Sequence, residues 1–326
     1  FQTHWARGEI IVVEGLADRL HGELWTPDWF MQHFGSDSAD IIDCRVGAEV
    51  LNVTVGQFFQ GFTSVDMRPI DSETKAPLIL KLKDWPADQD FESKFPAHFD
   101  DFMNALPFKP YFHRSGELNL SARLAPSYLP PDLGPKMYNA YGSGDGEGGV
   151  GTTNLHLDMA DAVNIMAFAS DPLLSSDPSA PNSTAFSAPP PAAAVWDLYP
   201  YEHLATLRRF LTTVAEERGI GIDDPVHDQR FYLDKALRER LYRETGVRGW
   251  RVLQNPGDAV FLPAGTAHQV CNYRDAIKIA IDFVSPETVD KCEGLTNEFR
   301  LLSNGHRRRV DLLQLKTILW HAVRDC

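Results

Sequence analysis

The chain has 326 residues, of which 43% are hydrophobic and 23% charged, and its formal net charge is −14 at pH 7. This length allows a large buried core, in one large domain or two small ones. The acidic balance disfavours direct binding to nucleic acid and is compatible with a basic peptide or protein partner. No apolar run approaches the roughly 18 residues of a membrane span, and residues 1–13 are too polar for a signal peptide. We therefore expect a soluble protein with no membrane partner.

The four cysteines lie far apart in the sequence and form no C-x-x-C pair. They are Cys44, Cys271, Cys292 and Cys326. This spacing argues against a structural zinc site and against a disulfide framework. We therefore expect a reducing compartment.

The N-terminal region, residues 1–115, is predicted to be mixed α and β, with no evident catalytic cluster. Thr26 and Pro27 provide an N-cap and a first-turn proline for a helix that ends before Gly35. Alternating apolar and basic residues over 78–86 indicate a half-exposed strand whose lysines face solvent. Further strands are expected at 9–13, 41–42 and 51–54, and further helices at 57–62 and 90–106, the last broken at Pro96.

From about residue 116 the sequence has the pattern of an all-β fold, in which short strands alternate with Gly, Pro and Asp turns. Strands are predicted at 118–124, 136–142, 152–158, 162–169, 250–254, 259–262 and 276–283. The glycine-rich stretch 142–151 is predicted to be an exposed, mobile loop.

Two insertions and a helical end complete the predicted organisation. The Ser-, Pro- and Ala-rich stretch 170–194 is expected to be a flexible insertion. Amphipathic patterns predict helices at 200–217 and 231–245, which form a helical insert over 200–246. Residues 286–326 are predicted to form C-terminal helices packed on the sheet.

A histidine and a carboxylate lie two residues apart in the predicted strand 152–158. On a β-strand this spacing points His156 and Asp158 to the same face. An imidazole nitrogen and a carboxylate oxygen are two of the three ligands of a facial triad, which holds non-haem Fe(II) and leaves positions open. His268, just after a proline-glycine turn at the start of a strand, can supply the third ligand. A structural role is the alternative for each histidine taken alone.

The predicted strand 276–283 carries a lysine on the same face as Ala280 and Asp282. Burial of Lys278 inside a barrel is unfavourable unless an anion meets it. The pattern therefore predicts an anionic ligand inside the barrel. Exposure of Lys278 on the surface is the alternative.

Seven segments share a pattern with one known family. They are LWTP at 24–27, LKLKDWP at 80–86, DLGPKMYNAYG at 132–142, TTNLHLD at 152–158, PVHDQ at 225–229, FLPAGTAHQV at 261–270 and DFVSPE at 282–287. Together they resemble the JmjC domain of the Jumonji-type histone lysine demethylases, closest to the subclass that acts on mono- and dimethylated lysine 9 of histone H3. The resemblance spans nearly the whole chain.

This resemblance implies a mainly β fold with surrounding α-helices, a double-stranded β-helix of the cupin or jelly-roll kind. It predicts a single JmjC catalytic domain over 1–326, with the β-helix core at 116–285. The zinc-binding segment that full-length relatives carry upstream is absent from the sequence. The chain is therefore expected to be either a fragment of a longer protein or an engineered one.

The resemblance also implies the chemistry. His156, Asp158 and His268 are expected to bind Fe(II), with 2-oxoglutarate as a chelating cosubstrate and O₂ as the oxidant. The expected reaction removes a methyl group from a lysine of the histone H3 tail as formaldehyde, with succinate and CO₂ as co-products. Chromatin is the implied partner and the nucleus the implied location. The alternatives are a 2-oxoglutarate-dependent protein hydroxylase and a catalytically impaired chromatin-binding scaffold.

Three residues are predicted cosubstrate contacts. Relatives commonly use a threonine three residues before the first ligand, here Thr153, although strict strand alternation would turn Asn154 inward unless a bulge intervenes. Many relatives also use an asparagine, which Asn164 matches, and a lysine nine residues beyond it, where this chain has Leu173. We therefore assign the far carboxylate of 2-oxoglutarate to Lys278.

Two tyrosines of the stretch 136–142 are predicted substrate contacts. Tyr138 and Tyr141 lie two predicted elements before the suspected metal ligands. A role in the core or at the rim is the alternative for both residues.

Overall fold

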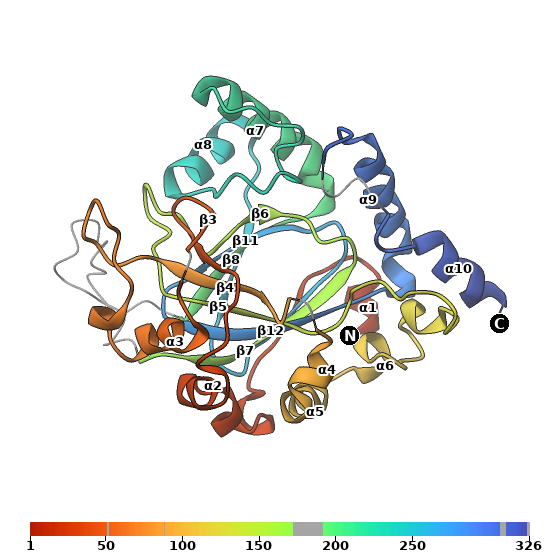
Figure 1. Cartoon of the computed structure of the whole chain (residues 1–326). Helices are drawn as coiled ribbons and strands as arrows, with labels where there is room; N and C mark the ends of the chain where they lie inside the picture. Colours follow the sequence, from red (N-terminus) through yellow and green to blue (C-terminus); the bar gives the residue numbers. More distant parts are fainter. Residues whose placement is uncertain (51, 88, 172–191, 307–310, 325–326) are drawn as a thin grey trace.

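A computed structural model describes the chain except residues 51, 88, 172–191, 307–310 and 325–326 (Figure 1). Two antiparallel sheets form its centre. The larger has the strand order β1-β10-β7-β12-β5-β4-β2-β3, and the smaller has the order β6-β11-β8-β9. The strands are β1 Ile11–Val13, β2 Ile41–Asp43, β3 Ala48–Glu49, β4 Leu80–Trp85, β5 Lys136–Ala140, β6 Thr153–His156, β7 Asp161–Ala169, β8 Ala194–Tyr199, β9 Trp250–Gln254, β10 Ala259–Leu262, β11 Ala267–Asn272 and β12 Ala276–Phe283.

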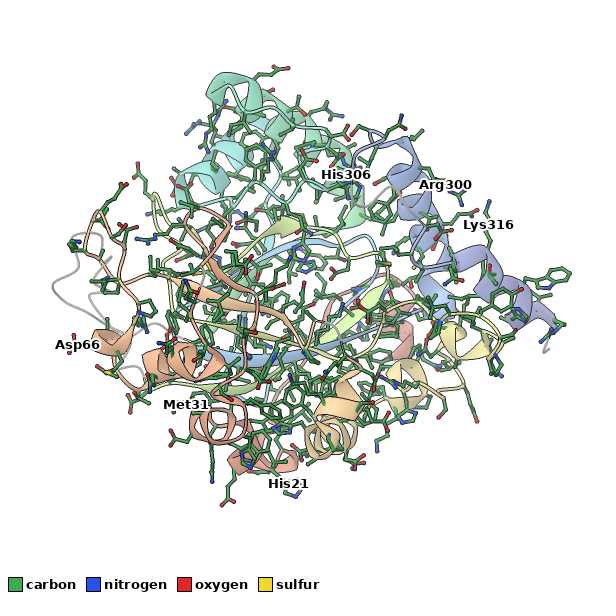
Figure 2. All side chains as sticks on the ribbon, viewed as in Figure 1. His21, Met31, Asp66, Arg300, His306 and Lys316 are labelled. Carbon is green, nitrogen blue, oxygen red and sulfur yellow. The ribbon has the colours of Figure 1, made fainter. Side chains whose placement is uncertain are left out.

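Helices surround this β centre, and Figure 1 shows α7 and α8 beyond the smaller sheet and α9 and α10 at one side. The α-helices are α1 Gln2–Trp5, α2 Pro27–Phe34, α3 Val55–Thr63, α4 Phe91–Lys94, α5 Pro96–Ala105, α6 Lys109–Phe112, α7 Leu204–Arg218, α8 Lys235–Thr245, α9 Val289–Leu301 and α10 Leu315–Arg324. Figure 2 shows the labelled polar side chains Asp66, Arg300 and Lys316 at the periphery. No helix of the described residues is both long and apolar enough to cross a membrane.

The larger sheet has one apolar face and one polar face at β12. Ile277, Ile279 and Ile281 pack into the largest core cluster, together with aromatic residues such as Phe30 of α2 and Phe58 of α3. Because successive side chains of a strand alternate between its two faces, Lys278 and Asp282 point the other way, into the barrel. The apolar packing thus determines which residues of β12 face the interior.

A second cluster covers the outer face of the smaller sheet. Leu155 and Leu157 pack there against the apolar sides of α7, α8 and α9. His156 and Asp158, which alternate with these leucines, therefore face the interior. The helical insert, predicted over 200–246, provides this cover.

Local signals predicted the helix ends well. The hydroxyl of Thr26 accepts a hydrogen bond from the backbone N–H of Trp29, Pro27 is the first helical residue of α2, and Gly35 follows its end. Pro96 begins α5. Both signals are confirmed because they depend only on residues within one turn of the helix end.

Two predicted strands are wrong. Residues 118–124 contain the 3-10 helix η4 (Leu120–Arg123), because the side-chain oxygen of Asn119 accepts from Ser121 N and Oγ at 3.3 and 2.7 Å. In the stretch 51–54, Thr54 caps α3 instead of extending a strand. Its hydroxyl accepts from Gln57 N, and the Gln57 side chain accepts from Thr54 N, which is a capping box.

The predicted boundary of the flexible insertion is wrong at its end. The range 170–194 falls largely on residues outside the described ones, but Ala194 begins β8. β8 lies between β11 and β9 in the smaller sheet and is buried throughout. Its six consecutive buried residues show no alternation, so the pattern of a half-exposed strand is absent.

The glycine-rich stretch 142–151 is attached to the barrel instead of exposed along its length. Asp145 is buried, and its carboxylate lies 3.1 Å from Arg238 Nη2 and 2.8 Å from Arg251 Nη2. Ion pairs with α8 and β9 therefore hold the loop that leads into β6. Cys44, Cys271 and Cys292 are free, as expected, and Cys326 lies outside the described residues.

Candidate metal centre

The pairing of β6 with β11 places two histidines opposite each other. His156 is the direct cross-strand partner of His268, in the antiparallel register of the smaller sheet. Their ring centroids are 4.2 Å apart. Two residues that lie far apart in the sequence are therefore brought into contact by the register of one strand pair.

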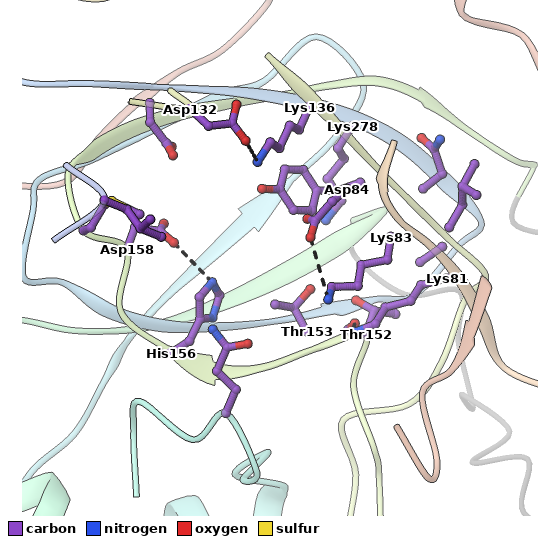
Figure 3. Close-up of a pocket in the computed structure, with 18 of the residues that line it drawn as sticks. Lys81, Lys83, Asp84, Asp132, Lys136, Thr152, Thr153, His156, Asp158 and Lys278 are labelled. Carbon is purple, nitrogen blue, oxygen red and sulfur yellow. Dashed lines mark hydrogen bonds and ion pairs between the residues drawn. The ribbon is translucent and has the colours of Figure 1, made fainter. Parts of the chain in front are cut away.

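Asp158 completes the cluster from just beyond the end of β6. One carboxylate oxygen lies 3.5 Å from His156 Nε2, and the other lies 3.5 Å from His268 Nε2. One donor atom from each residue lies within 4.8 Å of the other two. The three residues that the sequence predicted as metal ligands are thus brought together, and Figure 3 shows His156 and Asp158 at the wall of the cavity.

Backbone carbonyls determine the tautomer of both imidazoles. His156 Nδ1 lies 2.8 Å from the carbonyl of Asn154, and His268 Nδ1 lies 3.0 Å from the carbonyl of Thr266. A carbonyl oxygen only accepts, so in the neutral imidazole the proton lies on Nδ1 and the lone pair on Nε2, the atom that faces Asp158. Two imidazole Nε2 atoms and a carboxylate are the donor set of the facial triad, which fits Fe(II).

A cavity of about 360 Å³ opens beside the triad. This volume is within the range of small-molecule sites. Figure 3 shows that its wall carries lysines and carboxylates from several elements. Lys136 and Asp132 form an ion pair at 2.7 Å, and Lys83 lies 3.8 Å from Asp84. The cavity can therefore accommodate both an anionic and a cationic group.

Lys278 is buried at this cavity, with 4% of its surface exposed. The alternative that it lies on the protein surface is therefore wrong. Its Nζ is 5.4 Å from the ring centre of Trp196, and among the described residues no carboxylate lies within ion-pair distance of it. Burial lowers the pKa of Lys278 to about 7, because removal from water penalises the charged form. An anionic ligand would restore the charged form.

A bulge settles which side chain before His156 faces inward. The register shifts between the pairs His268–His156 and Val270–Thr153, so β6 has one more residue than β11 over this stretch. Thr153 consequently lines the cavity. The side chain of Asn154 points elsewhere, and its Nδ2 donates to the carbonyl of Gln229 at 2.9 Å. Of the two residues considered for the inward-facing position, Thr153 is therefore the one that faces the cavity.

The two predicted tyrosines have different positions. Tyr138 lines the cavity and is 39% exposed. The prediction that Tyr141 contacts substrate is wrong, because Tyr141 is fully buried on the other face of the larger sheet. Its ring stacks on Phe58 at a centroid distance of 5.0 Å, and its hydroxyl donates to the Phe58 carbonyl at 2.7 Å. Its spacing of three residues from Tyr138 places the two rings on opposite faces.

Asn164 lies on β7 and does not contribute to the lining of this cavity. Gln254 Nε2 lies 3.3 Å from its side-chain oxygen. The role of Asn164 toward 2-oxoglutarate stays a prediction, and the position of this residue does not support it. Leu173, at the position of the usual lysine, lies outside the described residues.

The lysines of β4 are site residues that the sequence pattern does not reveal. They were predicted to face solvent, but Lys81 and Lys83 line the cavity, and Lys81 Nζ donates to the carbonyl of Thr152 at 3.3 Å. β4 pairs with β5, the strand that carries Tyr138. The alternation in the sequence identified the strand, but only the sheet order shows which face meets the cavity.

Comparison with known proteins identifies the family. A family model described as "JmjC domain, hydroxylase" matches residues 179–283, a range that includes His268 and Lys278 and begins after His156 and Asp158. The chain is a JmjC-domain protein. This match agrees with the double-stranded β-helix fold expected from the sequence.

The similarity of this JmjC-domain protein to its relatives covers the whole chain. It is 42% identical to lysine-specific demethylase 3A of Mus musculus, with 100% of this chain and 26% of the relative covered. It is 41% identical to lysine-specific demethylase 3 of Drosophila melanogaster, of which it covers 40%. The probable JmjC domain-containing histone demethylation protein 2C of Homo sapiens is 34% identical, with 100% of this chain and 13% of the relative covered. The chain thus spans 13 to 40% of the length of these relatives.

The buried Lys278 predicts a pH-dependent stability. Its folded pKa of about 7 lies below the ordinary 10.5, so between these values the unfolded chain holds a proton that the folded protein lacks. Stability then rises with pH across this window, and the penalty of the buried ammonium is fully present below pH 7. Lys278→Met should therefore stabilise the ligand-free protein at about pH 6, and much less at about pH 10.

Urea unfolding midpoints at the two pH values measure this effect. Lys235→Met is the matched control, because the Lys235 side chain is 64% exposed. The control should show no pH-dependent gain. An equal gain from Lys278→Met at both pH values would contradict the burial of a charged lysine.

Proposed function

We propose that this JmjC-domain protein is an Fe(II)- and 2-oxoglutarate-dependent demethylase of mono- and dimethylated lysine 9 of histone H3. The observation that carries the proposal is the convergence of two imidazole nitrogens and a carboxylate at a cavity that also contains a buried lysine. The triad fits a metal, and the lysine fits an anionic cosubstrate. The names of the relatives support methylated lysine as the substrate, and the resemblance of the sequence supports lysine 9.

The residues have distinct roles in this proposal. His156, Asp158 and His268 hold Fe(II), and Thr153 and Lys278 orient 2-oxoglutarate. The ammonium of Lys278 binds the far carboxylate, and the hydroxyl of Thr153 donates a hydrogen bond to the cosubstrate. This contact orients the cosubstrate relative to the triad and offsets the burial of the lysine.

The bound metal, with 2-oxoglutarate and O₂, supplies the oxidation that converts the N-methyl carbon to a hydroxymethyl group and yields succinate and CO₂. The hydroxymethyl group leaves its nitrogen as formaldehyde, so the lysine has one methyl group fewer. The protein contributes the position of the methyl group, and this position sets which bond is oxidised.

Carboxyl groups and a tyrosine line the proposed substrate side of the cavity. They are Asp84, Asp132, Asp282 and Tyr138. Lys83 and Lys136 lie beside the first two carboxylates, and the whole chain carries a net charge of −14. A methylated lysine is a cation on a basic histone tail. The negative net charge of the chain therefore favours its approach. The proposal assigns Tyr138 to the substrate contact and leaves Tyr141 to the core.

The same reasoning extends to organisation and location. In this proposal residues 1–326 act as one catalytic domain, in which the N-terminal region and the C-terminal helices support the barrel. Clusters of buried residues link the N-terminal helices to the larger sheet, and α7, α8 and α9 to the smaller one. A histone H3 tail as substrate means chromatin as partner and the nucleus as location.

The direct test uses a dimethylated histone H3 lysine 9 peptide with Fe(II), 2-oxoglutarate and air. We expect formaldehyde, and a peptide mass lower by one methylene group for each turnover. The matched control His268→Ala, which removes one donor of the triad, should give neither. A mass higher by one oxygen without formaldehyde would instead identify a protein hydroxylase, and peptide binding without either product would identify a scaffold.

The cosubstrate assignment has its own test. Lys278→Ala removes the cation at the far carboxylate, so the apparent KM for 2-oxoglutarate should rise about 100-fold. The KM for the peptide should stay within about twofold, because in this proposal Lys278 contacts the cosubstrate and not the peptide. Lys235→Ala is the control, since the Lys235 side chain is 64% exposed and does not line the cavity. A KM for 2-oxoglutarate unchanged by Lys278→Ala sinks the assignment.

A further inference from the structure

The two histidines of the triad are supported in different ways. Thr266, whose carbonyl accepts from His268 Nδ1, closes the turn 263–266 through its own N–H, which donates to the carbonyl of Pro263 at 3.2 Å. Gly265 has φ +84° in this turn, in the left-handed region that glycine tolerates. The support of His268 is therefore local to its own turn.

His156 lies on an edge strand. β6 has four residues and, among the described strands, pairs only with β11, because it is the first strand in the order β6-β11-β8-β9. The carbonyl that accepts from His156 Nδ1 belongs to Asn154, within the bulge. An edge strand leaves a row of backbone groups without a neighbouring strand. Another segment has to hold this edge in place.

The segment 223–231, which we call the strap, runs along the outer edge of β6. Leu155 N donates to the carbonyl of Phe231 at 2.7 Å, and Asn154 Nδ2 donates to the carbonyl of Gln229 at 2.9 Å. Gln229 has φ +55°, a conformation that non-glycine residues rarely adopt, and it lines the cavity. Asn154 therefore orients His156 with its carbonyl and binds the strap with its amide.

Charged groups anchor the strap to two helices. Arg208 of α7 has Nε 3.0 Å from Asp224 of the strap and Nη2 2.6 Å from Glu298 of α9. His227 of the strap lies 3.1 Å from the same Glu298, and its side chain is only 1% exposed. Partial burial strengthens such a network, because water competes less for its members. The strap is thus joined to α7 and α9 as well as to β6.

We propose that Asn154, held by the strap, is a positioning residue for the metal ligand His156. This inference rests on the proposed function, since it takes His156 as a metal ligand. The amide of Asn154 fixes the peptide whose carbonyl accepts from Nδ1, and that contact fixes the tautomer and direction of the imidazole. Partners of this kind typically change metal affinity by about 10- to 100-fold when removed.

The test is the affinity of the protein for Mn(II), measured without turnover from the electron paramagnetic resonance signal of the free ion. Asn154→Leu keeps a similar volume and removes the donor to Gln229. Because the carbonyl that accepts from Nδ1 remains in this variant, we expect the dissociation constant for Mn(II) to rise about 10-fold, the lower end of the effect of removing such a partner outright. An unchanged constant overturns the inference.

The matched control is Asn119→Leu. Asn119 makes the same kind of bond, from Nδ2 to the carbonyl of His113 at 3.1 Å, and does not line the cavity. This control should lower the melting temperature and leave the Mn(II) constant unchanged. If Asn154→Leu behaves like the control, its role is structural and the inference fails.

Glu298→Gln provides a second variant in case Asn154→Leu does not fold. It weakens the anchor of the strap with no change of size, so we expect a smaller rise of the Mn(II) constant in the same direction. No rise contradicts the inference. If the wild-type protein itself does not bind Mn(II), the proposed function fails, and the inference fails with it. If the wild-type protein and all variants bind Mn(II) equally tightly, only the inference fails.

Discussion

The register between β6 and β11 is the constraint on which the site depends. It sets His156 opposite His268, and a slip of one residue would turn one of the two imidazoles to the other face of the smaller sheet. The bulge that follows the paired histidines turns Thr153 into the cavity and directs Asn154 to the strap. This bulge thus gives two adjacent residues different roles: Thr153 faces the ligand, and Asn154 supports His156.

The larger sheet supplies the other half of the site through β12. Ile277, Ile279 and Ile281 pack against the aromatic residues of the N-terminal helices, and each such burial stabilises the fold by about 1.5–3 kcal/mol. This packing holds Lys278 inside the barrel, where burial lowers its pKa to about 7. The core thus maintains a position that is unfavourable for an ammonium without an anion. A site that gains favourable contacts only when a ligand binds is expected to select that ligand by charge.

Local and periodic features of the structure could be predicted from the sequence, and tertiary ones could not. The cap of α2 depends on Thr26 and its neighbours, and the inward face of β12 follows from strict alternation. Tyr141 was misplaced because its partner, Phe58, lies 83 residues away in sequence. β8 was missed because a strand buried on both faces shows no alternation. The role of Asn154 depends on the strap, which only the fold brings to β6.

A metal and an anionic cosubstrate share one cavity in this account. Anomalous diffraction from crystals grown with Mn(II) and an unreactive analogue of 2-oxoglutarate tests this claim most directly. The account predicts a metal peak bonded to His156 Nε2, His268 Nε2 and the carboxylate of Asp158, with the far carboxylate of the analogue at Lys278 Nζ. A peak away from these three residues, or an analogue bound with its far carboxylate away from Lys278, would contradict it.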